Sequence, residues 1–250
     1  MSRIALITGA TSGIGKATAE AFAKSGIDLI LCGRRQDRLT ELSEVLSSSV
    51  KTTTLIFDVR DREAVMGAIG SLPTEWRNID ILVNNAGNAH GFDPIDTGNT
   101  DDWDAMIDSN VTGLLYVSKA VIPGMVERAK GHIVNISSIA GKETYANGTV
   151  YCASKAAVEA LSKGMRLDLI QHGIKVTNIA PGAVETEFSV VRFKGDEARA
   201  DKVYAGFEPL KAEDIADSIV YAVNAPAHVT IADVTILAGA QAAATTVHRK

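Results

Sequence analysis

The sequence predicts an α/β fold, in which one doubly wound parallel sheet of about seven strands carries helices on both faces. Short apolar runs alternate with helical patterns along the whole chain, as in folds built from parallel strands and crossover helices. Small, amide or charged residues follow the carboxyl ends of these runs, where such folds bind ligands. No linker, repeat or low-complexity tract interrupts the pattern, so we expect a single domain over residues 1–250.

The composition is typical of a water-soluble globular protein with a substantial core. Of its 250 residues, 46% are hydrophobic and 22% are charged. The net charge of −5 argues against a nucleic-acid partner or an anionic membrane surface. The apolar runs fall short of the roughly 20 residues of a membrane span, and no charged-then-apolar leader precedes the first strand. We therefore expect no membrane partner.

Cysteine and histidine usage indicates neither a disulfide framework nor a metal site. The two cysteines, Cys32 and Cys152, are too few for such a framework. Neither they nor the five histidines have the spacing of metal ligands. A reduced, cytoplasmic setting is the simplest inference.

The first strand, Ile4 to Ile7, leads into a glycine-rich turn with Gly9, Gly13 and Gly15, and a helical pattern follows. This arrangement points free backbone N–H groups and the positive end of a helix dipole at a phosphate. The G-x-x-x-G-x-G spacing differs from the common dinucleotide fingerprint, and glycines also serve tight turns in proteins that bind nothing. The position directly after an N-terminal strand favours the cofactor interpretation.

The second strand, Asp28 to Cys32, runs into Arg34 and Arg35, and a helix over Gln36 to Leu46 follows. An NAD site would carry a carboxylate near this point for the ribose 2′-hydroxyl. Two guanidinium groups suit a 2′-phosphate instead, so NADP(H) is the predicted cofactor. The alternative is that both arginines are solvated charges at the start of the helix.

The third and fourth strands also end in polar residues. Thr53 to Phe57 ends in Asp58-Val59, a tip that could meet an adenine edge, and a helix follows at about Arg62 to Ile69. Ile79 to Val83 leads into Asn84-Asn85-Ala86-Gly87, whose small and amide residues allow close backbone approach to a ligand. A plain turn would explain this tetrapeptide equally well.

A long helical pattern covers residues 101–128, and Asn110 lies inside it although an amide mildly disfavours helix. Either this side chain is solvated, or the helix breaks there so that Asn110 reaches a water or the site. The fifth strand, His132 to Ile136, then delivers Ser137 and Ser138 at its carboxyl end.

The remaining elements complete the alternation. A long helix runs from Val150 to about Ile170, and the sixth strand, Ile174 to Ala180, ends in Pro181-Gly182. A late helix, Lys211 to Val223, precedes a last strand over Thr230 to Leu237.

Tyr151 and Lys155 are four residues apart on the long helix, so they share a face. An ammonium beside a phenol favours the phenolate and lowers a phenol pKa that starts near ~10. Such a tyrosine can donate and accept a proton near neutral pH. Taken alone, the pair has a plain explanation, because Tyr and Lys often lie one turn apart on exposed helices.

Together these motifs resemble the classical short-chain dehydrogenase/reductase family over essentially the whole chain. The matching residues, in order, are Thr8-Gly9-x-x-x-Gly13-x-Gly15, Asn84-Asn85-Ala86-Gly87, Asn110, Ser138, Tyr151-x-x-x-Lys155 and Pro181-Gly182. The resemblance implies a Rossmann-type NADP(H)-dependent oxidoreductase, expected as a homotetramer. It further implies a cofactor half at about 1–135 and a catalytic and substrate half at about 136–250.

The resemblance also implies roles for individual residues. The catalytic set would be Asn110, Ser138, Tyr151 and Lys155. Lys155 would also hold the nicotinamide ribose, and Asn110 would hold a water that links Lys155 to solvent. The implied cofactor contacts are Gly9, Thr11, Ser12, Gly13, Ile14, Gly15, Arg34, Arg35, Asp58, Val59, Asn85, Ala86, Gly87, Tyr151, Lys155, Pro181, Gly182, Val184 and Thr186.

Within the family, residues 71–87, 191–202 and 226–234 and the last four residues resemble NADP-dependent 3-hydroxy acid dehydrogenases that oxidise serine and allo-threonine. Reductases of sulfoacetaldehyde and malonic semialdehyde have a similar pattern. The chain departs from the serine-oxidising members at Ala146-Asn147-Gly148-Thr149, where they carry a Gly-Gly-Asn run. This loop lines the substrate side in the family.

A small, anionic substrate needs a cation in its pocket, and Arg192 is the candidate because a guanidinium fork matches a carboxylate or sulfonate. Tyr145 could donate its hydroxyl to the same anion, beside Ser138 and Tyr151. Alternatively, Arg192 is a solvated lid or interface charge. Two other functions stay open: an NADPH-dependent reductase of neutral or bulkier carbonyls of lipid, steroid or acyl-carrier type, and a non-catalytic NADP(H) sensor.

Overall fold

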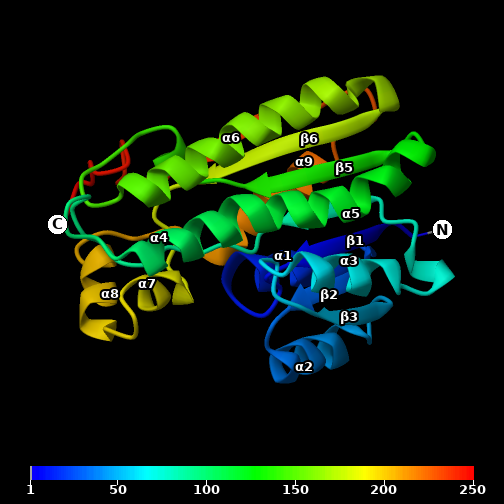
Figure 1. Cartoon of the computed structure of the whole chain (residues 1–250), viewed down its shortest axis with the longest axis horizontal. Coiled ribbons are helices and arrows are strands. Elements are labelled where there is room, and N and C mark those ends of the chain that lie inside the picture. Colours follow the sequence, from blue (N-terminus) through cyan, green and yellow to red (C-terminus); the bar gives the residue numbers. More distant parts are fainter. Residues whose placement is uncertain (1) are drawn as a thin grey trace.

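The computed structural model describes residues 2–250, which form one parallel seven-stranded sheet in the order β3-β2-β1-β4-β5-β6-β7 with helices on both faces (Figure 1). The strands are β1 Ile4–Thr8, β2 Asp28–Gly33, β3 Thr52–Ile56, β4 Ile81–Asn84, β5 Gly131–Ile136, β6 Ile174–Pro181 and β7 Asp233–Ile236. The helices are α1 Gly13–Lys24, α2 Gln36–Leu46, α3 Arg62–Gly70, α4 Thr100–Ile107, α5 Gly113–Glu127, α6 Thr149–Leu169, α7 Glu187–Arg192, α8 Glu197–Tyr204 and α9 Ala212–Val223. The predicted fold class is confirmed.

The central strands are continuous apolar runs because helices cover both of their faces. Successive side chains point to opposite faces, so Ile7 packs with α1, α2 and α9, whereas Leu6 packs with α3 and α5. Phe22 of α1 anchors the first layer and Met125 of α5 the second, and neither side chain is exposed to solvent. The sheet is therefore held between two apolar layers.

The strand order reverses at β1, which pairs with β2 on one side and β4 on the other. Ligands bind at this kind of switch point, beyond the carboxyl ends of the strands. The side chain of Asn85 fastens the junction, because its Nδ2 donates to the carbonyl oxygens of Thr8, at 2.9 Å, and Gly9, at 3.2 Å. Figure 1 shows α7, α8 and the C-terminus beyond the carboxyl ends of β5 and β6.

Two predicted elements have different bounds. The helical pattern over 101–128 is divided into α4 and α5 by a π-helical segment, Asp108–Thr112, which contains Asn110. A local break was one of the two alternatives for this residue. The last strand covers only Asp233–Ile236 of the predicted Thr230 to Leu237, because it pairs with β6 alone at the edge of the sheet.

The helices α7 and α8 were not predicted. Both are short, and α8 is rich in charged residues, so neither shows a long hydrophobic repeat. They are stabilised by packing against each other: the hydroxyls of Ser189 and Tyr204 lie 2.7 Å apart, and Tyr204 also donates to the carbonyl oxygen of Val184 at 2.8 Å.

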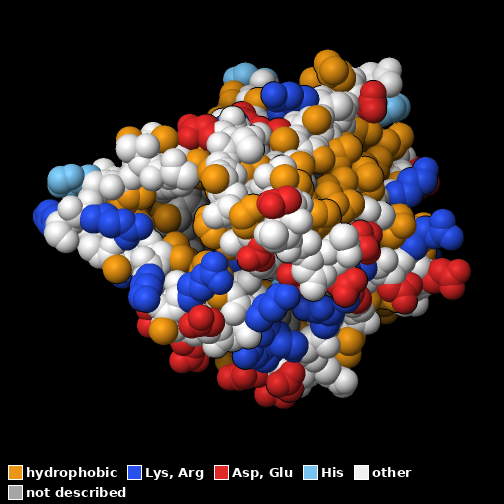
Figure 2. Space-filling view, turned by 60° about the vertical axis from the view of Figure 1, so that its left-hand side comes forward, with side chains coloured by type: hydrophobic (Ala, Val, Ile, Leu, Met, Phe, Trp, Pro, Cys, Tyr) orange, Lys and Arg blue, Asp and Glu red, His pale blue; other side chains and the backbone are white. Residues whose placement is uncertain are grey.

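Among residues 2–250, no helix combines the length and hydropathy of a membrane span. No three His, Cys, Asp or Glu side chains of the same residues group as metal ligands would. Figure 2 shows positive and negative side chains interspersed on the lower part of one face of the molecule.

Replacing Gly15 with Ala should destabilise the fold, because an added Cβ would collide with the carbonyl oxygen of Gly9. The backbone of the glycine-rich turn would have to move, at a cost of about 1–3 kcal/mol in the free energy of unfolding. The matched control is Gly164→Ala in α6, where the added Cβ meets nothing within 4 Å. That variant should be about 0.5–1 kcal/mol more stable than the parent. Urea unfolding of both variants tests this, and equal stabilities would contradict it.

Candidate active site

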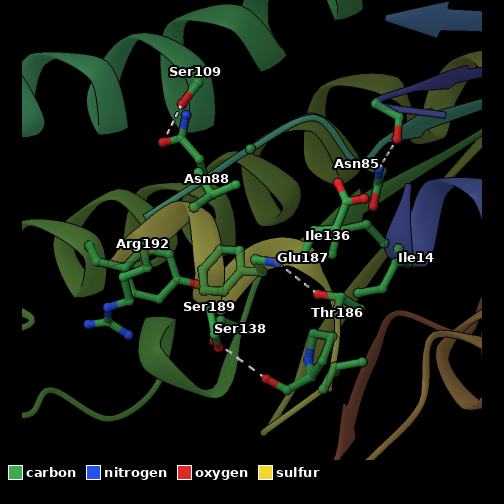
Figure 3. A pocket seen from close by; sticks show the side chains of 18 of the residues that line it. Ile14, Asn85, Asn88, Ser109, Ile136, Ser138, Thr186, Glu187, Ser189 and Arg192 are labelled. Atoms are coloured by element: carbon green, nitrogen blue, oxygen red, sulfur yellow. Dashed lines mark hydrogen bonds between the residues drawn. The ribbon is translucent and has the colours of Figure 1, made fainter. Parts of the chain in front are cut away.

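A cavity of about 960 Å³ lies at the carboxyl edge of the sheet (Figure 3). All but two of the predicted site residues line it. Those that do are Gly9, Thr11, Ser12, Gly13, Ile14, Arg34, Arg35, Asp58, Val59, Asn85, Ala86, Gly87, Ser138, Tyr145, Tyr151, Lys155, Pro181, Gly182, Val184, Thr186 and Arg192. In Figure 3, Arg192 and Ser138 lie at one end and Ile14 and Asn85 at the other, so the cavity joins the cofactor motifs to the tyrosine.

The glycine-rich turn brings the N-terminus of α1 to the cavity wall. Gly9 and Gly13 have φ values of +67° and +50°, in the left-handed region that favours glycine. A Cβ on Gly13 would lie 3.3 Å from the Thr186 side chain and would narrow the cavity. Gly15 does not line the cavity and supports the turn from behind, against Gly9. The turn thus leaves room for a ligand at the helix N-terminus.

Arg35 forms part of the rim at the end of β2. Its Nη2 donates to the hydroxyls of Thr11, at 2.6 Å, and Ser12, at 2.9 Å, while its Nη1 lies 3.1 Å from a carboxylate oxygen of Glu187. Arg38 donates to the other oxygen of Glu187 at 2.7 Å. Neither Arg38 nor Glu187 was predicted from the sequence. Arg38 could have been suspected one helical turn after Arg34, but nothing marked Glu187.

Arg34 and Arg60 extend this rim around Asp58. Arg60 binds both carboxylate oxygens, with Nη2–Oδ2 at 2.7 Å and Nε–Oδ1 at 3.1 Å, and Arg34 Nη1 lies 3.5 Å from Oδ2. Partial burial opposes ionisation of Asp58, but hydrogen bonds from Arg60 prevail and lower the pKa of the carboxyl. Arg60 was not predicted. The carboxylate of Asp58 is thus already bound to arginine, and its predicted contact with adenine stays a prediction.

Tyr151 and Lys155 are buried on α6, with 8% and 6% of their surfaces exposed. The alternative that Tyr151 and Lys155 merely lie one turn apart on an exposed helix is therefore wrong. The Lys155 ammonium donates to the carbonyl oxygen of Ile136 at 2.9 Å and lies 6.0 Å from the centre of the Tyr151 ring. Burial lowers the pKa of Lys155 to about 8, because the charged form loses its hydration.

The expected lowering of the tyrosine pKa is not observed in this structure. Burial raises the pKa of Tyr151, and the neighbouring Tyr145 adds to the effect. A hydrogen bond with Ser138 and the charge of Arg192 act in the opposite direction without cancelling it. The expectation fails because burial, which disfavours the charged phenolate, is the largest of these effects. Burial therefore favours the neutral phenol over the phenolate.

Ser138 follows the end of β5 by two residues, beside this tyrosine, and is also buried. Its Oγ accepts from the backbone N–H of Ala140 at 3.1 Å and donates to the carbonyl oxygen of Pro181 at 3.4 Å. The hydroxyl is thereby oriented by the backbone at the ends of β5 and β6. It can hydrogen-bond a ligand oxygen next to Tyr151.

Asn110 does not line the cavity. Its Nδ2 donates to the carbonyl oxygen of Asn88, at 2.8 Å, and to the hydroxyl of Ser154, at 2.9 Å, while Oδ1 accepts from the Asn88 N–H at 2.8 Å. A Cβ on Gly87 would lie 2.8 Å from Asn110 Oδ1 and 3.5 Å from Lys155 Nζ. Asn110 therefore holds the loop after β4 against α6, close to Lys155.

Arg192, at the end of α7, lies among aromatic rings beside the tyrosine. Its Cζ is 4.7 Å from the ring centre of Phe92 and 5.5 Å from that of Tyr151. Nη1 lies 3.5 Å from the Tyr145 hydroxyl. Phe188 covers Tyr151 as well, with ring centres 5.7 Å apart. Phe92 and Phe188 were missed because isolated apolar residues carry no signal of a site.

The end of the chain completes the wall. The Gln241 side chain accepts from the N–H of Ala183 at 2.9 Å, and Ala244 and Thr245 also line the cavity. Arg249 donates to the carbonyl oxygen of Val203 in α8 at 3.1 Å. None of these residues was predicted from the sequence, because their contacts are made only across the folded chain.

A family model described as short chain dehydrogenase matches residues 3–197. The NADP-dependent 3-hydroxy acid dehydrogenase YdfG of Escherichia coli (strain K12) is 46% identical over 99% of this chain and 100% of its own. Sulfoacetaldehyde reductase 2 of Chromohalobacter salexigens is 46% identical over 97% of this chain and 96% of its own.

Among solved structures, the closed form of a serine dehydrogenase complexed with NADP+ superimposes with a TM-score of 0.93. It is 46% identical and covers 99% of this chain and 100% of its own. These similarities extend over the whole chain, so they include every element that lines the cavity.

Lys155 should make stability depend on pH. In the unfolded chain a lysine titrates near ~10.4, whereas burial lowers the pKa of Lys155 to about 8 in the folded protein. Between these values the unfolded chain binds more protons, so the free energy of unfolding rises with pH. Relative to Lys155→Met, the parent should gain up to about 3 kcal/mol between pH 7 and pH 10.

Urea unfolding across this pH range measures the difference. The control is Lys163→Met on the same helix, whose side chain is exposed and should show no such dependence. Parallel pH profiles for the parent and Lys155→Met would contradict the assignment.

Proposed function

The chain belongs to the short-chain dehydrogenase family, and on that premise we propose that it interconverts a small hydroxy acid or hydroxy sulfonate and its aldehyde or ketone. It is an oxidoreductase that acts on CH–OH groups, with NADP(H) as its cofactor. One observation carries the substrate class: the Arg192 guanidinium lies 5.5 Å from the Tyr151 ring centre and reaches the Tyr145 hydroxyl. A guanidinium fork in this position suits a carboxylate or sulfonate.

The residues that line the cavity suit a dinucleotide cofactor that carries a 2′-phosphate. The glycine-rich turn opens the N-terminus of α1 to a pyrophosphate, and the arginines at the ends of β2 and β3 suit a 2′-phosphate. When bound, NADP(H) supplies the site that accepts or gives the hydride. The residues that would hold it are Gly9, Thr11, Ser12, Gly13, Ile14, Arg34, Arg35, Asp58, Val59, Asn85, Ala86, Gly87, Tyr151, Lys155, Pro181, Gly182, Val184 and Thr186, with Gly15 behind them.

Tyr151 is the proposed general acid and base. In reduction its hydroxyl gives a proton to the substrate oxygen, and in oxidation its phenolate takes one from the substrate hydroxyl. The raised pKa of the buried phenol favours the protonated form, which reduction requires. The Ser138 hydroxyl would hydrogen-bond the same substrate oxygen as charge develops on it.

Lys155 and Asn110 support this tyrosine. The Lys155 ammonium would bind ribose hydroxyls of the cofactor. Asn110 is proposed to hold a water that links Lys155 to solvent. Because its side-chain amide is bound to Asn88 and Ser154, that water would meet the backbone of Asn110.

Replacing Arg192 with Ala tests the substrate class. The KM for small acidic carbonyls should rise about 10- to 100-fold, because a charge-assisted hydrogen bond is lost. The KM for neutral carbonyls should stay within about twofold, since those substrates have no anion for Arg192 to bind. The control is Arg199→Ala, which removes another cavity-lining arginine, stacked 4.5 Å from the Phe193 ring. Equal effects on acidic and neutral substrates would refute an anion site at Arg192.

Replacing Tyr151 with Phe tests the proton-transfer role. Turnover with NADPH should fall by at least about 10²–10⁴-fold, because the proton donor is lost. NADPH binding, measured by fluorescence, should persist. Loss of turnover with binding retained would identify an enzyme, because a non-catalytic sensor has no turnover to lose. Tyr221→Phe is the matched control because Tyr221 is 66% exposed on α9. Substantial turnover by Tyr151→Phe would rule out the assignment.

A further inference from the structure

Glu187 connects the substrate-side helix α7 to the arginine rim of the cofactor cavity. One carboxylate oxygen lies 3.1 Å from Arg35 Nη1 and the other lies 2.7 Å from Arg38 Nη1. The three side chains come from the end of β2, from α2 and from the start of α7. The carboxylate therefore bridges two guanidinium groups across the mouth of the cavity.

Every nitrogen of Arg35 already has a partner in the described chain, and only Nη1 keeps a second N–H. Nε and Nη2 both donate to the Thr11 hydroxyl, Nη2 also donates to Ser12, and Nη1 donates to Glu187. The hydroxyls of Thr11 and Ser12 can turn and donate to a phosphate bound at the same arginine. A carboxylate can only accept, and it repels a phosphate. Of these partners, Glu187 is the one whose charge opposes a phosphate on Arg35.

We propose that Glu187 is an internal anion that occupies Arg35 and Arg38 in the cofactor-free protein and is displaced by the 2′-phosphate of the cofactor. The inference rests on the proposed NADP(H) dependence and deepens it. A cofactor with only a 2′-hydroxyl brings no anion to compete for Arg35, so Glu187 stays in place. Glu187 thus weakens binding of the phosphorylated cofactor alone.

The displacement has a consequence at the other end of α7. That helix is six residues long, and it begins at Glu187 and ends at Arg192. Phe188 and Arg192, on the same helix, both lie against the Tyr151 ring. Release of Glu187 frees the start of α7 from the arginine rim. The 2′-phosphate therefore changes how firmly α7 is held over Tyr151.

Glu187→Gln tests the competition without any turnover assay. Binding of 2′,5′-ADP, which carries the 2′-phosphate, and of 5′-AMP, which lacks it, is measured by calorimetry at low ionic strength. Glu187→Gln should bind 2′,5′-ADP roughly three- to tenfold more tightly than the parent, as expected from losing two exposed ion pairs, and 5′-AMP equally well. The control is Glu185→Gln, which removes the same charge from an exposed position two residues earlier. It should change neither affinity by more than about twofold.

Amide hydrogen exchange over Glu187–Arg192 supplies a second readout. In the parent, 2′,5′-ADP should speed exchange in α7 and 5′-AMP should not, whereas Glu187→Gln should exchange faster before any ligand is added. Protection of α7 by 2′,5′-ADP in the parent would overturn the proposal, because Glu187 would then stay in place.

The outcomes separate this inference from the function on which it rests. If the parent prefers 2′,5′-ADP and Glu187→Gln binds it equally or more weakly, Glu187 orients the arginines and only this inference fails. If the parent binds 2′,5′-ADP and 5′-AMP equally well, the assignment of NADP(H) fails together with it.

Discussion

The hydrogen bonds of the Asn85 amide with the carbonyl oxygens of Thr8 and Gly9 join the two strands at which the sheet order reverses. The turn before α1 and the loop after β4 both begin at this junction. The Thr8 hydroxyl reinforces it by accepting from the backbone N–H groups of Asn85 and Ala86. Gly9 and Gly15 permit the close approach, since a Cβ at either would meet Asn85 or the turn itself. The cavity walls are positioned relative to this junction.

Burial determines the chemistry at the centre of the cavity. Tyr151 and Lys155 lie between the sheet and the covering segments, and burial disfavours the charged form of each. The phenol is kept as an acid, and the ammonium is easier to deprotonate than an exposed lysine. The backbone carbonyl of Ile136 is the one polar partner that the described chain gives to this ammonium. A ligand that brings hydroxyl groups to the site would therefore be well bound.

Much of the fold, and about half of the residues that line the cavity, could be predicted from local patterns. The strand ends at Gly9, Arg35, Asn85 and Ser138 were recognisable because parallel strands place their carboxyl ends at one edge. Arg60, Glu187 and Phe188 were not recognisable, because an isolated charge or ring looks like a surface or core residue. The helices α7 and α8 depend on contacts such as that between Ser189 and Tyr204, which no local pattern reveals.

The sequence by itself determined the alternating strands and helices, the glycine-rich turn and the shared helix face of Tyr151 and Lys155, since these depend on neighbours within a few residues. Tertiary structure alone decided how the pKa values of that pair shift, because burial and the direction of the Lys155 ammonium depend on the whole fold. It also decided that α7 joins the arginine rim to the tyrosine, because Glu187 meets Arg35 and Arg38 only after the sheet has formed. Contacts between residues distant in the chain follow from packing, which is a property of the folded molecule.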